Sequence, residues 1–119
     1  MKRIILLLMA LSVAYAPAGH AVTAKVKGFI TKTIVANGQF GGCMVSIDKK
    51  LADLGLVCLG KSVSFSCDGT FAPQDVASRM FEQAQMAFSK NRKVIIYVED
   101  NKKHNGYCYG NRIDVLKQD

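Results

Sequence analysis

Alternating apolar and polar residues dominate positions 23–67 and predict three short β-strands. Many of the side chains are β-branched, which suits a pleated and half-buried surface. The parity of the apolar residues changes near Gly28, so we expect a bulge or a bend there. Asn37 and Gly38 form a dipeptide typical of a hairpin turn. The predicted strands span residues 23–36, 39–48 and 61–67.

The period then changes to that of an amphipathic helix over residues 73–90. Pro73 suits the first helical turn, and Lys90 suits the last. One face of this helix is apolar and is expected to pack against the core: Val76, Ala77, Met80, Phe81, Ala84, Ala87 and Phe88. The opposite face is polar and is expected to meet solvent: Arg79, Glu82, Gln83, Gln85 and Lys90.

After the helix, an almost continuous apolar run over residues 93–99 predicts a fourth strand buried on both faces. We expect a polar loop over residues 100–106 and a last strand over residues 107–116. Three strands, a helix and two strands indicate a single, mostly β domain over residues 22–119, a five-stranded OB-fold-like barrel. A two-layer α+β sandwich could use the same elements. The barrel is favoured because closure leaves few exposed strand edges.

The N-terminal segment, residues 1–21, is typical of a secretory signal. Lys2 and Arg3 precede a short apolar run, and small residues follow. We place cleavage after Ala21, with Ala18 and Ala24 as alternative sites. The run is too short for a comfortable bilayer span, and no second long apolar stretch follows. The sequence therefore predicts an exported bacterial protein, periplasmic or secreted, without a membrane span after cleavage.

The chain is basic, with 16 Lys and Arg residues against 9 Asp and Glu residues. Loss of Lys2 and Arg3 with the signal leaves 14 basic residues against 9 acidic ones, a net charge of +5. Such a charge can indicate a nucleic-acid partner. Export and the scatter of the lysines along the chain argue against that partner, so we predict no nucleic-acid binding.

Four cysteines follow the signal segment, and none of them forms a C-x-x-C pair or has a zinc-type spacing to a histidine. In a small exported domain, an even number of cysteines indicates disulfides. If Ile47 lies opposite Val63 in antiparallel strands, Cys43 faces Cys67 on the same side of the sheet. The first pairing is therefore Cys43–Cys67 with Cys58–Cys108, and the second is Cys43–Cys58 with Cys67–Cys108.

Nothing in the sequence indicates catalysis, a cofactor or a bound metal ion. His104 is the only histidine after the signal segment, and it falls in a predicted polar loop without a motif-defined nucleophile. The carboxylates show no acid–base motif. Gly41 and Gly42 lack the Lys and Ser/Thr that follow in a phosphate-binding loop. The sequence therefore predicts a protein that is not an enzyme.

Aromatic and amide side chains cluster around the last predicted strand and the first hairpin. Such side chains suit the face of a sugar ring and its hydroxyl groups. The alternative is that both tyrosines pack on the barrel with their hydroxyls in water. The candidate ligand-binding residues are Gln39, Phe40, Tyr107, Tyr109, Asn111 and Arg112.

Several segments resemble the OB-fold binding subunits of pentameric bacterial toxins, such as subtilase cytotoxin and typhoid toxin, and related small exported bacterial proteins. The resemblance is carried by residues 71–99 (FAPQDVASRMFEQAQMAFSKNRKVIIYVE), by residues 28–31, by Cys43 and by residues 111–116 (NRIDVL). It implies a binding module for a surface glycan and assembly into a homopentamer whose helices line a central pore. Where those subunits have a Tyr-Phe pair before the cysteine, this chain has Gly41 and Gly42, and it has no tryptophan.

Together these observations predict an exported, non-catalytic binding module of the toxin B-subunit type that recognises carbohydrate. A second interpretation fits the same sequence. It is a monomeric periplasmic accessory OB-fold protein that binds a protein partner or a small ligand. A multimeric ring distinguishes the first interpretation from the second.

Overall fold

The computed structural model describes residues 22–118. The predicted signal segment and its cleavage sites at Ala18 and Ala21 lie outside these residues. The strands are β1 (Thr23–Val35), β2 (Cys43–Ile47), β3 (Ser62–Ser64), β4 (Lys93–His104) and β5 (Tyr107–Val115). The helices are α1 (Gln74–Ser89) and two short 3-10 turns, η1 (Phe40–Gly42) and η2 (Leu51–Leu54).

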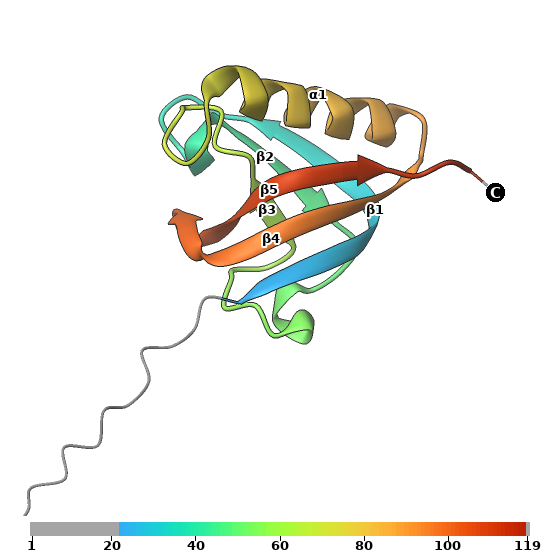
Figure 1. Cartoon of the computed structure of the whole chain (residues 1–119), viewed down its shortest axis with the longest axis horizontal. Coiled ribbons are helices and arrows are strands. Elements are labelled where there is room, and N and C mark those ends of the chain that lie inside the picture. Colours follow the sequence, from blue (N-terminus) through green and yellow to red (C-terminus); the bar gives the residue numbers. More distant parts are fainter. Residues whose placement is uncertain (1–21, 119) are drawn as a thin grey trace, which may run out of the picture.

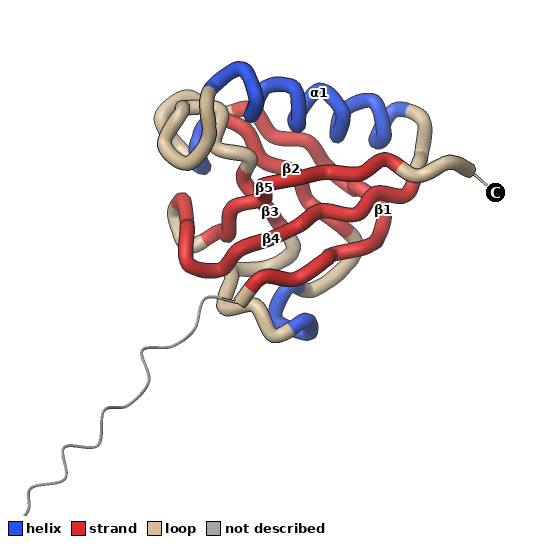
Figure 2. Tube along the Cα trace, in the orientation of Figure 1, coloured by secondary structure: helices blue, strands red, loops and turns tan. Residues whose placement is uncertain are grey.

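The five strands close into a barrel in the order β1-β2-β3-β5-β4. The first part of β1 pairs with β4, and from Ile30 onward β1 pairs with β2, with an irregularity between Ile30 and Lys32. β3 and β5 close the barrel through a short parallel pairing. α1 packs over one side of the strands (Figures 1 and 2) and contacts β1, β2, β4 and β5. The predicted five-stranded barrel with one helix is confirmed, and the two-layer alternative is not formed.

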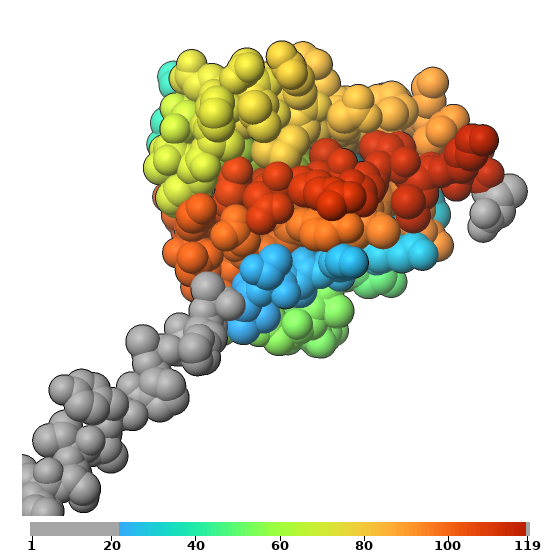
Figure 3. All heavy atoms as spheres, in the orientation of Figure 1, coloured from blue at the N-terminus to red at the C-terminus, as the bar shows by residue number. Residues whose placement is uncertain are grey.

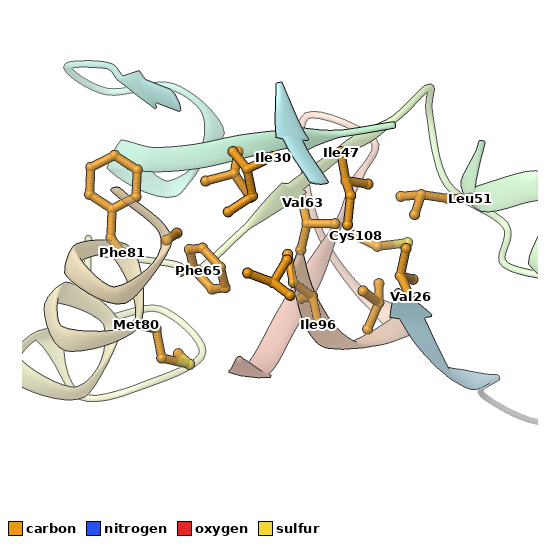
Figure 4. Packing of buried hydrophobic residues seen from close by; sticks show 14 of the residues in the cluster. Val26, Ile30, Ile47, Leu51, Val63, Phe65, Met80, Phe81, Ile96 and Cys108 are labelled. Atoms are coloured by element: carbon orange, nitrogen blue, oxygen red, sulfur yellow. The ribbon is translucent and has the colours of Figure 1, made fainter. Parts of the chain in front are cut away.

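The core fills the barrel and the space beneath α1. Alternate residues of β1 and β4 point inward, so Val26 and Ile96 are fully buried. Figure 4 shows Phe65 between Phe81 of α1 and Val63 of β3, where it joins the helix to the barrel interior. Burial of these side chains provides the main stabilisation of so small a domain.

Only part of the predicted apolar face of α1 is buried against the barrel. Met80, Phe81 and Ala84 are buried as expected. Phe88 lies in the last turn and is 45% exposed, and Val76 at the edge of the stripe is 41% exposed. The prediction that these two side chains belong to the core is therefore wrong.

The predicted register of β2 and β3 is wrong by two residues, although the predicted disulfide forms. Val45, and not Ile47, lies opposite Val63. β3 ends at Ser64, and Ser66 then adopts a left-handed φ of 60° that bends the chain. The bend brings Cys67 to Cys43, with 5.6 Å between their Cα atoms.

Cys58 and Cys108 form the second disulfide, so the first of the two predicted pairings is confirmed. Cys108 also pairs in register with Val63, which places this bridge beside the contact between β3 and β5. Disulfides persist in oxidising compartments. Within residues 22–118, no helix has the length and apolar character needed to cross a bilayer.

Two connections differ from the predictions. The second strand begins at Cys43, because a left-handed turn over residues 40–42 follows the Asn37–Gly38 dipeptide. The predicted polar loop over residues 100–106 is largely strand, because β4 continues to His104 and pairs with β5 beyond an irregularity after Glu99.

β4 is buried on one face, and not on both faces as the sequence predicts. Its inward residues are buried, whereas Ile95 and Tyr97 on the other face are only partly buried.

We expect the Cys58–Cys108 bridge to stabilise the fold more than the Cys43–Cys67 bridge, because it closes a separation of 50 residues against 24. Loss of chain entropy in the unfolded state predicts about 4 and about 3.5 kcal/mol respectively. Double Cys→Ala variants of each pair, compared by urea unfolding without reductant, measure these values. Unchanged stability in either double variant would contradict the assignment.

Candidate ligand-binding rim

The structure brings together two of the predicted site residues, Phe40 and Tyr107, at one end of the barrel. Their ring centroids lie 5.5 Å apart in an edge-to-face arrangement. Phe40 belongs to the connection between β1 and β2, and Tyr107 begins β5 after the tight turn that follows β4. Both connections lie at the left of Figure 1. We call Phe40, Asn105 and Tyr107 the rim.

Phe40 adopts an unusual backbone conformation for a bulky residue. Its φ is 57°, and Gly41 and Gly42 after it also have positive φ values. Left-handed backbone costs about 1–3 kcal/mol for a side chain of this kind and persists only where its surroundings impose it. Here the Phe40 N–H donates to Asn105 Oδ1 at 2.9 Å, and its carbonyl accepts from Ser64 Oγ at 2.7 Å.

Close packing beneath the rim explains why Gly41 follows Phe40. A Cβ atom at Gly41 would lie 2.6 Å from the His104 ring and 2.7 Å from Ser64 Oγ. The φ of 68° at this position also favours glycine. Gly41 therefore allows the first connection to rest directly on Ser64 of β3 and on His104 at the end of β4.

Ser66 is the centre of a buried hydrogen-bond network under the rim. Its hydroxyl lies 3.0 Å from each of three partners: the Phe71 N–H, Asp68 Oδ1 and His104 Nε2. The Phe71 ring packs on the His104 ring, with 4.7 Å between centroids. This network joins the segment that follows β3 to the end of β4.

The Ser66 hydroxyl accepts from the Phe71 N–H and donates to the Asp68 carboxylate. Its contact with His104 Nε2 runs in the direction that the tautomer of the ring sets. Ser66 is fully buried and joins the segment after β3 to the end of β4. We call Ser66, Asp68 and His104 the clamp.

His104 does not lie in the polar loop that the sequence predicts. It ends β4, and its side chain is only 14% exposed. The prediction failed because the strand continues past the apolar run. The Asn105–Gly106 dipeptide, which forms the tight turn with φ values of 53° and 85°, is the sequence signal that indicates this hairpin.

The other predicted site residues lie apart from the rim pair or are already engaged. Tyr109 is 5% exposed and packs on Phe71. Burial and the nearby charge of Glu99 raise the pKa of its hydroxyl. Asn111 donates to Glu99 at 2.8 Å. Gln39 is exposed beside Phe40.

Arg112 is held on the outer face of β5. Its Nε donates to Asp114 Oδ1 at 2.9 Å, and its guanidinium lies 4.4 Å from the centroid of the Tyr97 ring. The hydrogen bond and the charge of Asp114 raise the pKa of Arg112. This side chain is therefore part of a surface cluster on β4 and β5, separate from the rim.

Among residues 22–118, no group of three or more His, Cys, Asp or Glu side chains could hold a metal ion. Comparison of the chain with protein-family models, curated proteins and solved structures gives no match. The resemblance to toxin binding subunits therefore stays a prediction from the sequence.

Replacement of Ser66 by Ala is expected to destabilise the protein by about 2–3 kcal/mol, because it leaves the Phe71 N–H and His104 Nε2 without a partner in a buried site. Urea unfolding measures the change. Ser62→Ala is the matched control, since it removes a hydroxyl that bonds only to Ser46 at a partly buried position. Equal losses in the two variants would contradict the central role of Ser66.

Acid is expected to weaken the clamp through Asp68. Partial burial raises the pKa of this carboxyl, but hydrogen bonds from Thr70 and Ser66 and the charge of His104 outweigh that effect, so the pKa of Asp68 lies below its ordinary value. A lowered pKa contributes stability above the unfolded-state value of about 3.9, and this contribution is lost as the pH falls through the folded-state value.

The stability difference between the native chain and Asp68→Asn should therefore shrink as the pH falls below about 4. Urea unfolding at a series of pH values measures it. Asp53→Asn, at an exposed carboxyl in η2, is the control. A difference for Asp68→Asn that is independent of pH would contradict the proposed role of its charge.

Proposed function

We propose that this protein is an exported, non-catalytic binding module that recognises a surface glycan at the rim. The observation that carries the proposal is the constrained position of Phe40. Its backbone is held in a strained conformation by Asn105 and Ser64, and its ring packs edge-on against Tyr107. Strain of this kind concentrates at functional sites.

The position of the rim in the barrel supports the same function. In OB folds, the connections between strands one and two and between strands four and five bind oligosaccharides or oligonucleotides. In this chain those two connections meet through Phe40, Asn105 and Tyr107. Export disfavours an oligonucleotide, so an oligosaccharide is the better candidate.

The chemistry of the rim suits a sugar. Phe40 and Tyr107 are both partly exposed, so their rings can pack against the C–H face of a pyranose. The amide of Gln39, the Asn105 amide nitrogen and the Tyr107 hydroxyl can bond to its hydroxyl groups. The proposal includes no chemical step. Assembly into a pentamer rests only on the sequence resemblance.

A glycan array probed with the labelled protein tests the proposal, followed by calorimetry with the best glycan. Tyr107→Ala should weaken binding about tenfold, because a well-placed aromatic contact is worth about 1–1.5 kcal/mol. Phe40→Gly should weaken binding similarly without loss of stability, since glycine accepts the left-handed φ. Tyr97→Ala removes an aromatic ring from the outer face of β4 and should leave binding unchanged.

Two outcomes would overturn this function. One is an array without any bound glycan. The other is full binding by Phe40→Gly, or an equal loss in the Tyr97→Ala control, since either result would place the contact elsewhere on the surface.

A further inference from the structure

The surface is hollowed at the end of β4 that lies away from the rim. Two adjoining hollows, of about 450 and about 400 Å³, share Lys27, Phe29 and Lys93 as lining residues. Lys93 is the first residue of β4, whereas His104 beneath the rim is the last. Lys117 borders one hollow, and Lys49 borders the other. We call the two hollows together the basic groove.

Segments far apart in the sequence build this groove. Phe29 of β1 lies directly opposite Lys93 of β4 in the antiparallel pair, and residues 116–118 follow the end of β5 beside them. Figure 3 shows β1 in blue, β4 in orange and the C-terminal residues in red side by side on one face. The groove is therefore a product of barrel closure, which the sequence pattern does not reveal.

Positive charge dominates the groove. Four lysines line it, and Asp48 is its one acidic lining residue. Within residues 22–118, Lys27, Lys49 and Lys93 form no ion pair. Like charges brought together repel one another, so their convergence favours occupation by an anion.

The floor of the groove has a fixed polar group and an apolar surface. Asp48 Oδ1 accepts the Phe29 N–H at 2.9 Å, and the Asp48 N–H donates to the Phe29 carbonyl at 3.0 Å. Gly28 makes room for this carboxylate, because a Cβ atom there would overlap it. The Phe29 ring is partly exposed, with the Lys93 ammonium 5.4 Å from its centroid.

We infer that the basic groove binds a sugar that carries phosphate or sulfate groups. Lys27 and Lys93, shared by both hollows, hold one anionic group, and Lys49 or Lys117 holds a second. The Phe29 ring packs against the C–H face of the sugar. Asp48, whose Oδ2 makes no hydrogen bond within residues 22–118, accepts from a sugar hydroxyl. This site shares no residue with the rim and does not depend on the function proposed there.

A heparin-derived tetrasaccharide, compared with its desulfated form by calorimetry at low salt, tests the anion requirement. The sulfated form should bind, its affinity should fall as salt is added, and the desulfated form should bind at least about tenfold more weakly. Equal binding of the two forms, or no binding of the sulfated form, would overturn the inference.

Matched charge variants test the location. Lys27→Gln/Lys93→Gln should weaken binding of the sulfated tetrasaccharide about tenfold. Lys102→Gln/Lys103→Gln makes the same change in net charge at the far end of β4 and should change binding less than about twofold. Equal losses in the two double variants would show attraction by net charge alone and would overturn the inference.

A third comparison tests the sugar contact. Phe29→Leu should weaken binding of the tetrasaccharide about fivefold, because a flat aromatic face is lost, and should leave binding of inorganic pyrophosphate unchanged. Equal effects on the two ligands would overturn the assignment to a sugar. Phe40→Gly should leave all binding in the groove intact, so failure of the rim proposal is distinguishable from failure of this one.

The source of the sugar can be a free polysaccharide or the headgroup of a lipid. Phosphatidylcholine vesicles with and without a phosphorylated glycolipid separate the two. Sedimentation of the protein with only the glycolipid vesicles supports a membrane headgroup. Binding to the soluble tetrasaccharide alone supports a free polysaccharide. Sedimentation with pure phosphatidylcholine vesicles would overturn the inference, because that surface offers no anionic sugar.

Discussion

The barrel closes between β3 and β5, the two strands with the shortest pairing, and the remaining structure depends on that closure. β3 has only three residues, and its parallel contact with β5 joins Val63 to Cys108 and Ser64 to Tyr109. This short pairing has few hydrogen bonds, so by itself it holds β3 and β5 together only weakly. The Cys58–Cys108 bridge fixes the same place covalently, because one of its cysteines lies in the contact itself. With this bridge, the three-residue strand β3 is sufficient to complete the barrel.

Closure also determines what lies at each end of β4. At one end, the chain before β2 and the turn before β5 meet, and buried hydroxyls of Ser64 and Ser66 support them. At the other end, the start of β4 meets β1 and the residues after β5, and lysines gather around Phe29. One strand thus separates a rim of aromatic and amide groups from a basic groove. The two surfaces suit different parts of a ligand, or different ligands.

Two serines of the third predicted strand are buried and hydrogen-bonded, which the sequence pattern does not indicate. The alternation of serines with Val63 and Phe65 indicates only an outward polar face for the third strand. In the structure, Ser64 and Ser66 are fully buried and bond to the backbone of Phe40 and Phe71. The Ser64 hydroxyl also accepts the Ser66 N–H at 3.1 Å, so this backbone donor has a partner directly after β3 ends.

The elements that depend on local pattern and covalent chemistry could be predicted from the order of the residues. The helical period after Pro73 and the alternation in β1 fix an amphipathic helix and an early strand, and even cysteine numbers indicate two bridges. Element ends were less predictable. The Asn37–Gly38 dipeptide predicts a short turn, whereas the observed connection continues through a left-handed turn over residues 40–42. The second hairpin has the same kind of local signal in Asn105–Gly106, within a segment whose polar residues predict a loop.

The register between strands and the contacts between distant side chains are set by the folded barrel. A two-residue shift between β2 and β3 keeps every side chain on the same face, so alternation cannot distinguish the two registers. Likewise, the aromatic character of Phe40 and Tyr107 is visible in the sequence, but the contact between their rings depends on closure of the barrel. The lysines of the basic groove are scattered along the chain and converge only in the fold. The local pattern indicates on which face of a strand or helix a side chain lies. The residues that this side chain contacts depend on the long-range packing of the whole barrel.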